Sequence, residues 1–356
     1  MYLGISLARE LLRRNPEHEF LFIGTARGLE SKIVPGEGFR LECITSRGLK
    51  RVGALDFMRN LMLVPRSFLQ SRKLLGGFAP GVVVGVGGYS SGPVVLAAWW
   101  ASIPTLIIEP NAYPGLTNRW LARVVDRAAV AMPEAAASFR GRASVTGIPV
   151  RKEFSEIARR QRDGSNFEVL IYGGSQGSHA LNSIVCAALG DLRRLSPRLH
   201  LTHQTGEREF GPVQSAYRDA GIRADIRPFL PRIYEEFAGA DLIIARAGAG
   251  TVAEITAAGR AAILVPFPGA ADDHQTRNAQ ALEQAGAARM VRESEWRPGQ
   301  LAAEICRFME HPEELARMEE ASRKLAKPDA AAQIADIIES LAEMKSRQPE
   351  KRAASH

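Results

Sequence analysis

The chain has 356 residues, of which 46% are hydrophobic and 24% are charged. This composition belongs to a globular protein with room for two domains and excludes an intrinsically disordered chain. The three cysteines, Cys43, Cys186 and Cys306, form no CxxC pair. They argue against a disulfide scaffold and a zinc site, and they fit a reducing cytoplasm.

The formal net charge of +7 is concentrated near the amino terminus, where residues 1–75 hold 13 basic and 7 acidic side chains. Between Arg47 and Lys73, 7 basic residues alternate with apolar ones against the single acidic Asp56. Two interpretations stay open: an ordinary helix with a solvated basic face, or a segment lying on an anionic membrane surface. No pattern of basic and stacking aromatic residues predicts nucleic-acid binding.

The first predicted helix covers residues 3–14 and ends at Asn15-Pro16. Its charged side chains, among them Arg9, Arg13 and Arg14, predict that it is not a signal peptide. A strand follows at 20–24. Residues 74–108 carry no charge, which raises the possibility of a transmembrane helix, but ten of these 35 residues are Gly or Pro. The segment therefore favours a buried strand, a glycine loop, a helix and a second strand.

Strand and helix patterns alternate through the rest of the chain. Further elements are predicted as strands at 128–132, 144–147, 167–175, 199–206, 224–230, 241–248 and 261–268, and as helices at 179–195, 208–220, 231–238, 251–258, 275–285, 312–327 and 329–345. This βαβ alternation predicts parallel sheets with right-handed crossovers. We expect two nucleotide-binding α/β domains, 1–148 completed by a helix at about 329–345, and 149–328. They would face each other across a ligand-binding cleft, with 346–356 as a polar tail.

The segment GGSQGSHALN, residues 173–182, follows a predicted strand and opens a helix. Glycines let the backbone approach a ligand, and the amino end of a helix favours a phosphate. Ser175 adds a hydroxyl donor. A tight turn without a ligand explains the same residues, and the segment is neither a Walker A loop nor a GxGxxG fingerprint.

The segment RAGAGTVAEITAAG, residues 246–259, also admits two interpretations. Thr251 and Glu254 have the spacing of a capping box, with Thr at the N-cap and Glu at N3. Alternatively, Glu254 accepts hydrogen bonds from the vicinal hydroxyls of a ribose, as carboxylates do in dinucleotide sites.

The segment PFPGAADDHQTRNA, residues 266–279, is predicted as a polar loop after a buried strand. Asp272, Asp273 and His274 are adjacent, so at most two of them could bind one metal ion, and we expect sugar contacts from His274 and Gln275 instead. His200 and His203 lie on opposite faces of a predicted strand and are not a ligand pair.

Six motifs stand in the order found in the MurG family: GVGGYSSGP, EPNAYPGLTNRWLA, GIPVR, GGSQG, GAGTVAE and DDHQTRNA. The chain resembles this family from residue 1 to about 340. The resemblance implies the GT-B fold and an inverting, metal-independent transfer without a cofactor. GlcNAc would pass from UDP-GlcNAc to the C4 hydroxyl of MurNAc in undecaprenyl-pyrophosphoryl-MurNAc-pentapeptide (lipid I), giving lipid II.

The resemblance also implies roles for individual residues. Ser175 would hold the diphosphate of UDP, and Arg151 the donor phosphate or sugar. Leu230 would contact uracil through its backbone. The ribose and phosphate segment would be Ala249, Gly250, Thr251, Val252, Ala253 and Glu254. Gln275 and His274 would bind GlcNAc hydroxyls, and Asn111 would approach the donor sugar. The loop 87–93 and the stretch 47–73 would face the lipid acceptor at the cytoplasmic face of the inner membrane, which implies a peripheral membrane enzyme of cell-wall synthesis.

The resemblance is incomplete at the amino terminus. Family members carry a strand and a GGTGGH-x-x-P loop before the first helix, whereas this sequence begins with MYLG, and Leu3 stands at the place of the proline. The loop histidine is a favoured general base of the family, so the base is unknown here, with Glu109 and Tyr89 as weak candidates. We expect Met1 to be an internal methionine, with the strand and loop encoded upstream.

Two alternatives to a MurG-type transferase remain. One is another GT-B enzyme that moves a UDP-sugar to a different lipid. The other is a UDP-GlcNAc-binding protein whose catalysis is lost together with the amino-terminal loop.

Overall fold

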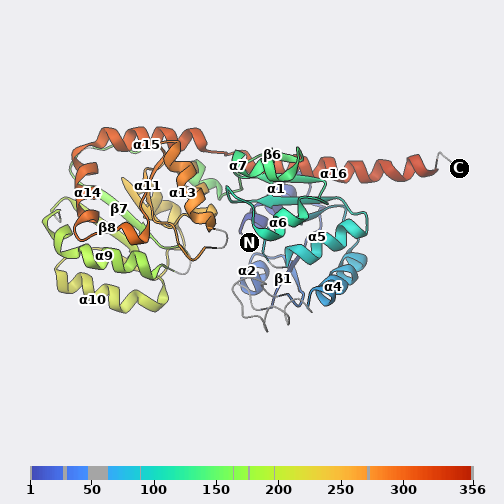
Figure 1. Cartoon of the computed structure of the whole chain (residues 1–356), viewed down its shortest axis with the longest axis horizontal. Coiled ribbons are helices and arrows are strands. Elements are labelled where there is room, and N and C mark those ends of the chain that lie inside the picture. The colour runs from blue at the N-terminus through green and yellow to red at the C-terminus, as the bar shows by residue number, and fades with distance from the viewer. Residues whose placement is uncertain are drawn as a thin grey trace. The chain divides into compact units, whose positions relative to one another are not determined.

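The chain forms two compact units, each described here by itself (Figure 1). The computed structural model describes residues 2–26, 30–46, 63–88, 90–162, 164–174, 177–195, 197–270 and 273–353. Unit 1 comprises Met1–Pro149 and Asp329–His356, and unit 2 comprises Val150–Pro328. Most of the predicted basic stretch, residues 47–62, lies outside the described residues, as does the end of the predicted tail, 354–356.

Unit 1 contains two parallel sheets, one of order β1-β2 and one of order β3-β4-β5-β6. Its elements are α1 (Tyr2–Arg14), β1 (Leu21–Gly24), α2 (Glu30–Gly36), β2 (Arg40–Cys43), α4 (Leu63–Phe78), β3 (Val83–Gly85), α5 (Ser91–Trp100), β4 (Thr105–Glu109), α6 (Leu116–Leu121), β5 (Arg127–Val130), α7 (Pro133–Ala136), η1 (Ala137–Phe139), β6 (Ala143–Val145) and α16 (Ala330–Ala353). The charge-free segment thus folds as β3, α5 and β4, which confirms the prediction. None of the helices described in the structure is long and apolar enough to span a membrane.

The carboxyl-terminal helix α16 completes unit 1 by packing on α1. Ile334, Ala335 and Leu341 of α16 are each at most 1% exposed. Arg14 at the end of α1 donates to Asp336 Oδ1 at 2.7 Å and to Glu339 Oε2 at 2.7 Å. Burial of the apolar face of α16 contributes most of the free energy of its packing on α1, because exposed ion pairs contribute little.

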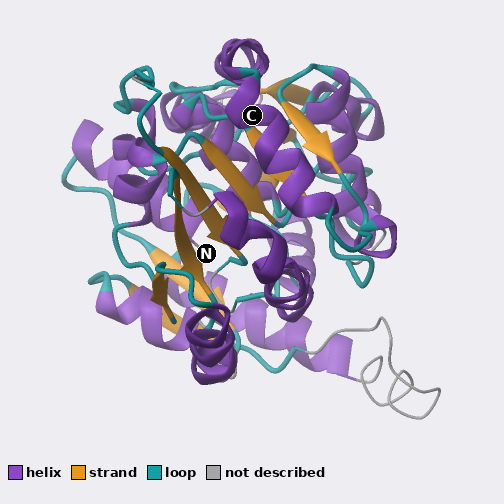
Figure 2. Cartoon of the chain, turned by 90° about the vertical axis from the view of Figure 1, so that its left-hand side faces the viewer, coloured by secondary structure: helices purple, strands orange, loops and turns teal. Residues whose placement is uncertain are grey.

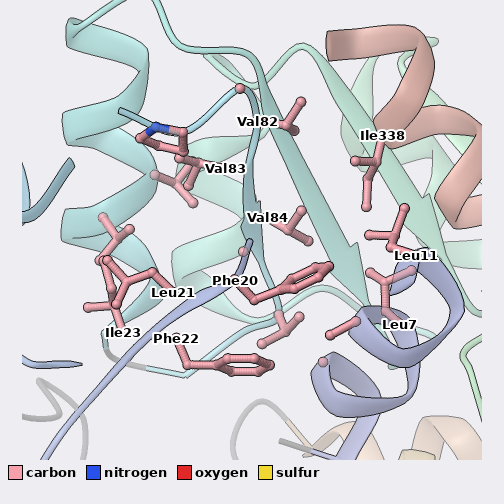
Figure 3. A pocket seen from close by; sticks show the side chains of 18 of the residues that line it. Leu7, Leu11, Phe20, Leu21, Phe22, Ile23, Val82, Val83, Val84 and Ile338 are labelled. Carbon is pink, nitrogen blue, oxygen red and sulfur yellow. The ribbon is translucent and has the colours of Figure 1, made fainter. Parts of the chain in front are cut away.

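A cavity of about 350 Å³ separates the two sheets of unit 1. Strands β1 and β3 form its edges, α1 and α16 cover one face, and α4 and α5 cover the other (Figure 3).

Unit 2 contains one six-stranded parallel sheet of order β12-β11-β10-β7-β8-β9. Its elements are α8 (Lys152–Ser155), β7 (Phe167–Tyr172), α9 (His179–Leu192), η2 (Arg193–Leu195), β8 (Leu199–Gln204), η3 (Glu207–Glu209), α10 (Phe210–Ala220), β9 (Asp225–Arg227), α11 (Ile233–Gly239), β10 (Leu242–Ala245), α12 (Ala249–Ala258), β11 (Ala262–Leu264), α13 (His274–Gln284), β12 (Ala288–Met290), η5 (Glu293–Glu295), α14 (Gln300–Glu310) and α15 (Pro312–Leu325). Because both faces are covered, β10 and β11 are buried along their whole length.

Helices lie on both faces of the strands, as expected for doubly wound sheets (Figure 2). In unit 2, α9 and α10 lie on one side of β7 and β8, while α11, α13 and α15 lie on the other (Figure 1). The predicted α/β class with parallel sheets is confirmed. The sequence analysis did not predict strands β2 and β12 or helix α14. The two strands have only 4 and 3 residues, which is too short for an alternation of apolar and polar residues to be recognised.

We expect Ile334→Ala to destabilise unit 1 by about 2–4 kcal/mol, because it removes buried methyl and methylene groups from the contact between α16 and its unit. Hydrogen exchange measured in each unit should show faster opening of α1 and unchanged opening of β7 and β10. Asp336→Ala on the same helix is the matched control, because its ion pair with Arg14 is exposed and should contribute less than about 1 kcal/mol. Equal effects of the two substitutions would contradict the dominance of the apolar face.

Candidate functional site

The candidate site of unit 2 lies at the switch point of its sheet, between β7 and β10. The chain runs outward from β7 through β8 to β9, and then returns to β10 on the other side of β7. Loops that leave two adjacent parallel strands in opposite directions leave room for a ligand at the carboxyl ends. Helices α9, α12 and α13 begin after β7, β10 and β11, so their amino ends all lie at this edge and favour an anion.

The glycine loop after β7 is shaped by close backbone contacts. Gly177 has a φ of +75°, and a Cβ there would lie 2.1 Å from the carbonyl oxygen of Thr205. A Cβ on Gly173 would lie 2.5 Å from the Ser178 nitrogen. Both positions therefore require glycine, and the turn explains them without a ligand. Ser175, the predicted diphosphate ligand, and Gln176 lie outside the described residues.

A buried network supports this loop from below. Asn182 on α9 donates to the Thr205 carbonyl at 3.0 Å, and its Oδ1 lies 3.0 Å from His203 Nε2. Burial lowers the pKa of His203 to about 4, so the imidazole is neutral at pH 7. The network holds Thr205 against Gly177, and Asn182 had no role in the sequence-based prediction.

Ser178 and Arg246 join the two loops of the switch point. The Ser178 hydroxyl caps α9 by accepting from the Leu181 nitrogen at 3.3 Å, and it accepts from Arg246 Nε at 2.8 Å. Arg246 also donates to the Val265 carbonyl at 3.1 Å and pairs with Glu293 at 2.5 Å. This buried arginine therefore holds the carboxyl ends of β7, β10 and β11 together. In the sequence, the only signal for this role of Arg246 is its place at the start of the RAGAG segment.

The capping-box interpretation of Thr251 and Glu254 is wrong. Helix α12 begins at Ala249 with Gly248 at its N-cap, so Thr251 already lies inside the helix. Val252, Ile255 and Thr256 are buried in unit 2. Gly250, Thr251 and Glu254 are spaced at i, i+1 and i+4 and share the opposite, less buried side. This leaves Glu254 without the capping role that its spacing suggested.

Glu254 and Arg151 are electrostatically coupled in unit 2. Burial raises the pKa of Glu254 to about 7, and the positive charge of Arg151 opposes that rise. The Arg151 guanidinium lies over the rings of Phe154, at 5.1 Å, and Tyr234, at 5.3 Å. A perturbed carboxylate beside an oriented arginine is typical of binding and catalytic sites.

The Arg151 side chain also connects this pair with the predicted uracil segment. Its Nη1 donates to the Pro231 carbonyl at 3.3 Å. Leu230, directly before it, is 5% exposed, so a ligand could meet only its backbone, as the resemblance implies. Unit 2 therefore brings Arg151, Leu230 and Glu254 together, with Ala249 and Ala253 on the same helix as Glu254.

The predicted sugar-binding residues lie at the amino end of α13. Gln275 Oε1 accepts from the Phe267 nitrogen at 3.0 Å, and His274 is the first residue of the helix. Asn278, which is fully buried, donates to the Ala247 carbonyl at 3.1 Å and ties α13 to the loop before α12. Asp273 Oδ1 accepts a hydrogen bond from the Thr276 hydroxyl at 2.6 Å. Asp272 lies outside the described residues. No cluster of side chains suited to a metal ion occurs among the residues that the structure describes.

In unit 1, Glu109 organises the loop after β4. The buried carboxylate accepts from the nitrogen of Asn111 at 2.9 Å and from its Nδ2 at 3.0 Å. It also accepts from the Gly115 nitrogen at 3.2 Å and from Asn118 Nδ2 at 2.8 Å. These four bonds give Glu109 a structural role and argue against it as the general base. Tyr89, the other candidate, lies outside the described residues.

Two α/β units with parallel sheets, one of which has an edge that favours an anion at its switch point, are typical of the two-domain nucleotide-sugar glycosyltransferases. Residues 1–130 match the glycosyltransferase family 28 N-terminal domain, and residues 168–334 match the family 28 C-terminal domain. The chain belongs to the MurG family, and the predicted GT-B fold is confirmed.

Individual relatives support this assignment. The UDP-N-acetylglucosamine–N-acetylmuramyl-(pentapeptide) pyrophosphoryl-undecaprenol N-acetylglucosamine transferase of Anaeromyxobacter sp. (strain Fw109-5) is 48% identical over 95% of this chain and 89% of that protein. The enzyme of the same name from Myxococcus xanthus is 42% identical, over 95% of this chain and 88% of its own length. The crystal structure of Acinetobacter baumannii MurG superposes with a TM-score of 0.78 at 30% identity, covering 95% of both chains.

The raised pKa of Glu254 predicts how stability depends on pH. The folded state retains this proton up to about pH 7, whereas the unfolded carboxyl releases it near pH 4.5. Unfolding free energy should therefore fall between pH 4.5 and 7, by up to about 3 kcal/mol from this group. Glu254→Gln should remove that fall in chemical denaturation at pH 5 and pH 8. The exposed Glu235→Gln, as control, should retain it, and identical pH profiles for wild type and Glu254→Gln would contradict the assignment.

Proposed function

We propose that this protein transfers GlcNAc from UDP-GlcNAc to the C4 hydroxyl of MurNAc in undecaprenyl-pyrophosphoryl-MurNAc-pentapeptide, giving lipid II. The observation that carries the proposal is the edge of unit 2, where Glu254 and Arg151 lie beside an anion-favouring set of helix ends. The chain's similarity to transferases named for this reaction, at 48% and 42% identity, supports the same donor and acceptor.

The donor site is assigned residue by residue. The diphosphate would bind the amino ends of α9 and α12, with Ser175 and Gly250 beside it. The ribose diol would donate to Glu254, and uracil would meet the backbone at Leu230. Gln275 and His274 would bind the GlcNAc hydroxyls. Asn111 belongs to unit 1, and its approach to the donor sugar stays a prediction.

The reaction forms one bond and breaks another at the GlcNAc anomeric carbon. The acceptor oxygen attacks C1, the bond from C1 to the diphosphate oxygen breaks with inversion, and the acceptor proton leaves with a base. Negative charge grows on the departing UDP, where helix amino ends and Arg151 would stabilise it. Arg151 is held by two aromatic rings, so it needs little reorganisation when the charge appears.

Two alternatives are separated by one assay. The 356-residue chain is mixed with UDP-GlcNAc and lipid I, and lipid II is measured. Lipid II formation supports the proposal. UDP-GlcNAc binding without product would favour a binding protein, and transfer to a different lipid would favour another GT-B enzyme.

Unit 1 carries exposed apolar side chains suited to a membrane surface. Trp99 and Trp100 on α5 are 45% and 66% exposed, and Trp120 on the neighbouring α6 is 66% exposed. The Arg123 guanidinium lies 5.6 Å from the Trp120 ring. Tryptophan beside arginine suits the interface of an anionic bilayer. We therefore infer peripheral binding at the cytoplasmic face of the inner membrane, as the resemblance implies.

The donor assignment predicts opposite effects of Glu254→Gln on binding and stability. At pH 8 the variant should bind UDP-GlcNAc at least about tenfold more weakly, because hydrogen bonds to a charged group contribute roughly 1.5–3 kcal/mol. Its unfolding free energy should rise, since a buried charge is removed. Calorimetric titration and chemical denaturation measure both. A lower stability with unchanged affinity would refute the ribose role, and Glu235→Gln is again the control.

The membrane assignment predicts that Trp100→Ser and Trp120→Ser together weaken vesicle binding. Each exposed indole should contribute on the order of 1 kcal/mol of interfacial binding, so the double variant should bind vesicles with 30% anionic lipid roughly tenfold or more less tightly. Sedimentation with vesicles measures this. The control Leu325→Ser removes an apolar residue of unit 2 that is 36% exposed, and this variant should bind vesicles normally. Normal sedimentation of the double variant would exclude this surface.

A further inference from the structure

Gln204 is the last residue of β8 and places a buried polar side chain at the carboxyl edge of the unit 2 sheet; it is 1% exposed. Its Nε2 donates to the Pro228 carbonyl at 3.1 Å, whereas its Oε1 is buried and has no hydrogen-bond partner among the residues that the structure describes. A buried acceptor without a donor opposes folding, and an apolar side chain of the same length would avoid that cost. Stability therefore does not explain a glutamine here, and its one hydrogen bond is the feature that calls for a function.

The Gln204 side chain points to the same face of the sheet as the aromatic cluster under Arg151. Gln204 lies in register with Tyr172 of β7, and residues in register on neighbouring strands share a face. The Tyr172 ring centroid is 6.2 Å from that of Phe237 on α11. Phe237 in turn is 5.0 Å from Phe154, one of the two rings under the Arg151 guanidinium. Gln204 and Arg151 are thus connected by a continuous layer of rings.

The segment 228–231, which follows β9, is held at both ends by these two side chains. At its start, Gln204 Nε2 donates to the Pro228 carbonyl. At its end, Arg151 Nη1 donates to the Pro231 carbonyl at 3.3 Å. Two bonds at opposite ends fix the direction of the peptide groups between them.

Leu230 lies between these two anchored carbonyls. Its backbone nitrogen finds no acceptor among the described residues. An N–H group of fixed direction and without a partner is suited to a carbonyl oxygen of a ligand. The C4 carbonyl of uracil is such an oxygen, whereas cytosine carries an amino group at C4, so two donors would face each other.

We propose that Gln204 is a positioning residue that makes the donor site select uracil over cytosine. It acts through the Pro228 carbonyl, whose orientation sets the direction of the Leu230 N–H. This inference rests on the proposed binding of UDP-GlcNAc at unit 2 and adds a residue that determines which base is accepted. The unpaired Oε1 is the cost of placing an amide donor under the segment.

Gln204→Met tests this role, because it keeps the length of the side chain and removes the hydrogen bond. The affinity for UDP should fall about fivefold, and the preference for UDP over CDP should shrink by a similar factor, as expected for one lost orienting hydrogen bond. The affinity for ribose 5-diphosphate, which lacks a base, should stay unchanged. Calorimetric titration measures all three. Gln214→Met replaces an exposed glutamine on α10 and is the matched control, which should leave the three affinities unchanged.

Thermal unfolding of the same variants separates positioning from a merely structural role. In Gln204→Met the Pro228 carbonyl keeps the Gly206 nitrogen, at 3.1 Å, as its donor, and the unpaired Oε1 is removed. The melting temperature should therefore not fall. A lower melting temperature with equal loss of affinity for UDP and ribose 5-diphosphate would overturn the proposal. An unchanged preference for UDP over CDP would overturn it as well.

The test distinguishes this inference from the proposed reaction, because it measures nucleotide binding and not transfer. A wild-type chain that prefers UDP to CDP, together with a Gln204→Met variant that loses this preference, supports the inference even when no lipid II is formed. A wild-type chain that binds UDP no more tightly than ribose 5-diphosphate does not recognise the base, and that result would overturn the inference.

Discussion

The parallel direction of every strand is the constraint on which the rest of this structure depends. All strand pairings among the described residues, from β1 with β2 to β8 with β9, are parallel. Parallel strands need crossover helices, and these helices bury both faces of the sheet. They also bring every strand's carboxyl end, and the amino end of the helix that follows it, to the same edge. In unit 2 this edge gathers the amino ends of α9, α12 and α13, which favour an anion.

The sequence predicted most of this architecture because buried parallel strands are continuous apolar runs between helical patterns. It predicted the wrong helix start at α12, since Thr251 and Glu254 have capping-box spacing while Gly248 is the N-cap in the structure. It could not predict the roles of Arg246 and Asn278, because each acts through carbonyl groups that are distant in sequence, such as Val265 and Ala247. The site residues beyond the motifs therefore depend on tertiary contacts that spacing does not encode.

Glu254 shows why a binding residue can oppose the stability of its own unit. Burial raises its pKa to about 7, so the charged form is disfavoured in the unliganded protein. A ribose diol would supply donors to the carboxylate and recover part of the lost solvation. Arg151 partly compensates the charge without a bond to it, because its guanidinium is already held by Phe154, Tyr234 and the Pro231 carbonyl. Replacing Glu254 by a neutral residue would remove the desolvation cost of its charge. The same replacement would remove the carboxylate that accepts from the ribose, as is common when stability and function compete.

The two units differ in how completely their sheets are built. In unit 2 the core is continuous from Phe167 to Leu315, and its six strands are paired in one sheet. In unit 1 the sheet is interrupted by a cavity of about 350 Å³ between β1 and β3. Each unit has its own core, so the Arg246–Ser178 connection in unit 2 does not depend on the packing of unit 1. The proposed donor residues Arg151 and Glu254 lie within unit 2, whereas the proposed membrane surface around Trp120 lies within unit 1. Substitutions at the proposed donor site and at the proposed membrane surface therefore act on different units, each with its own core.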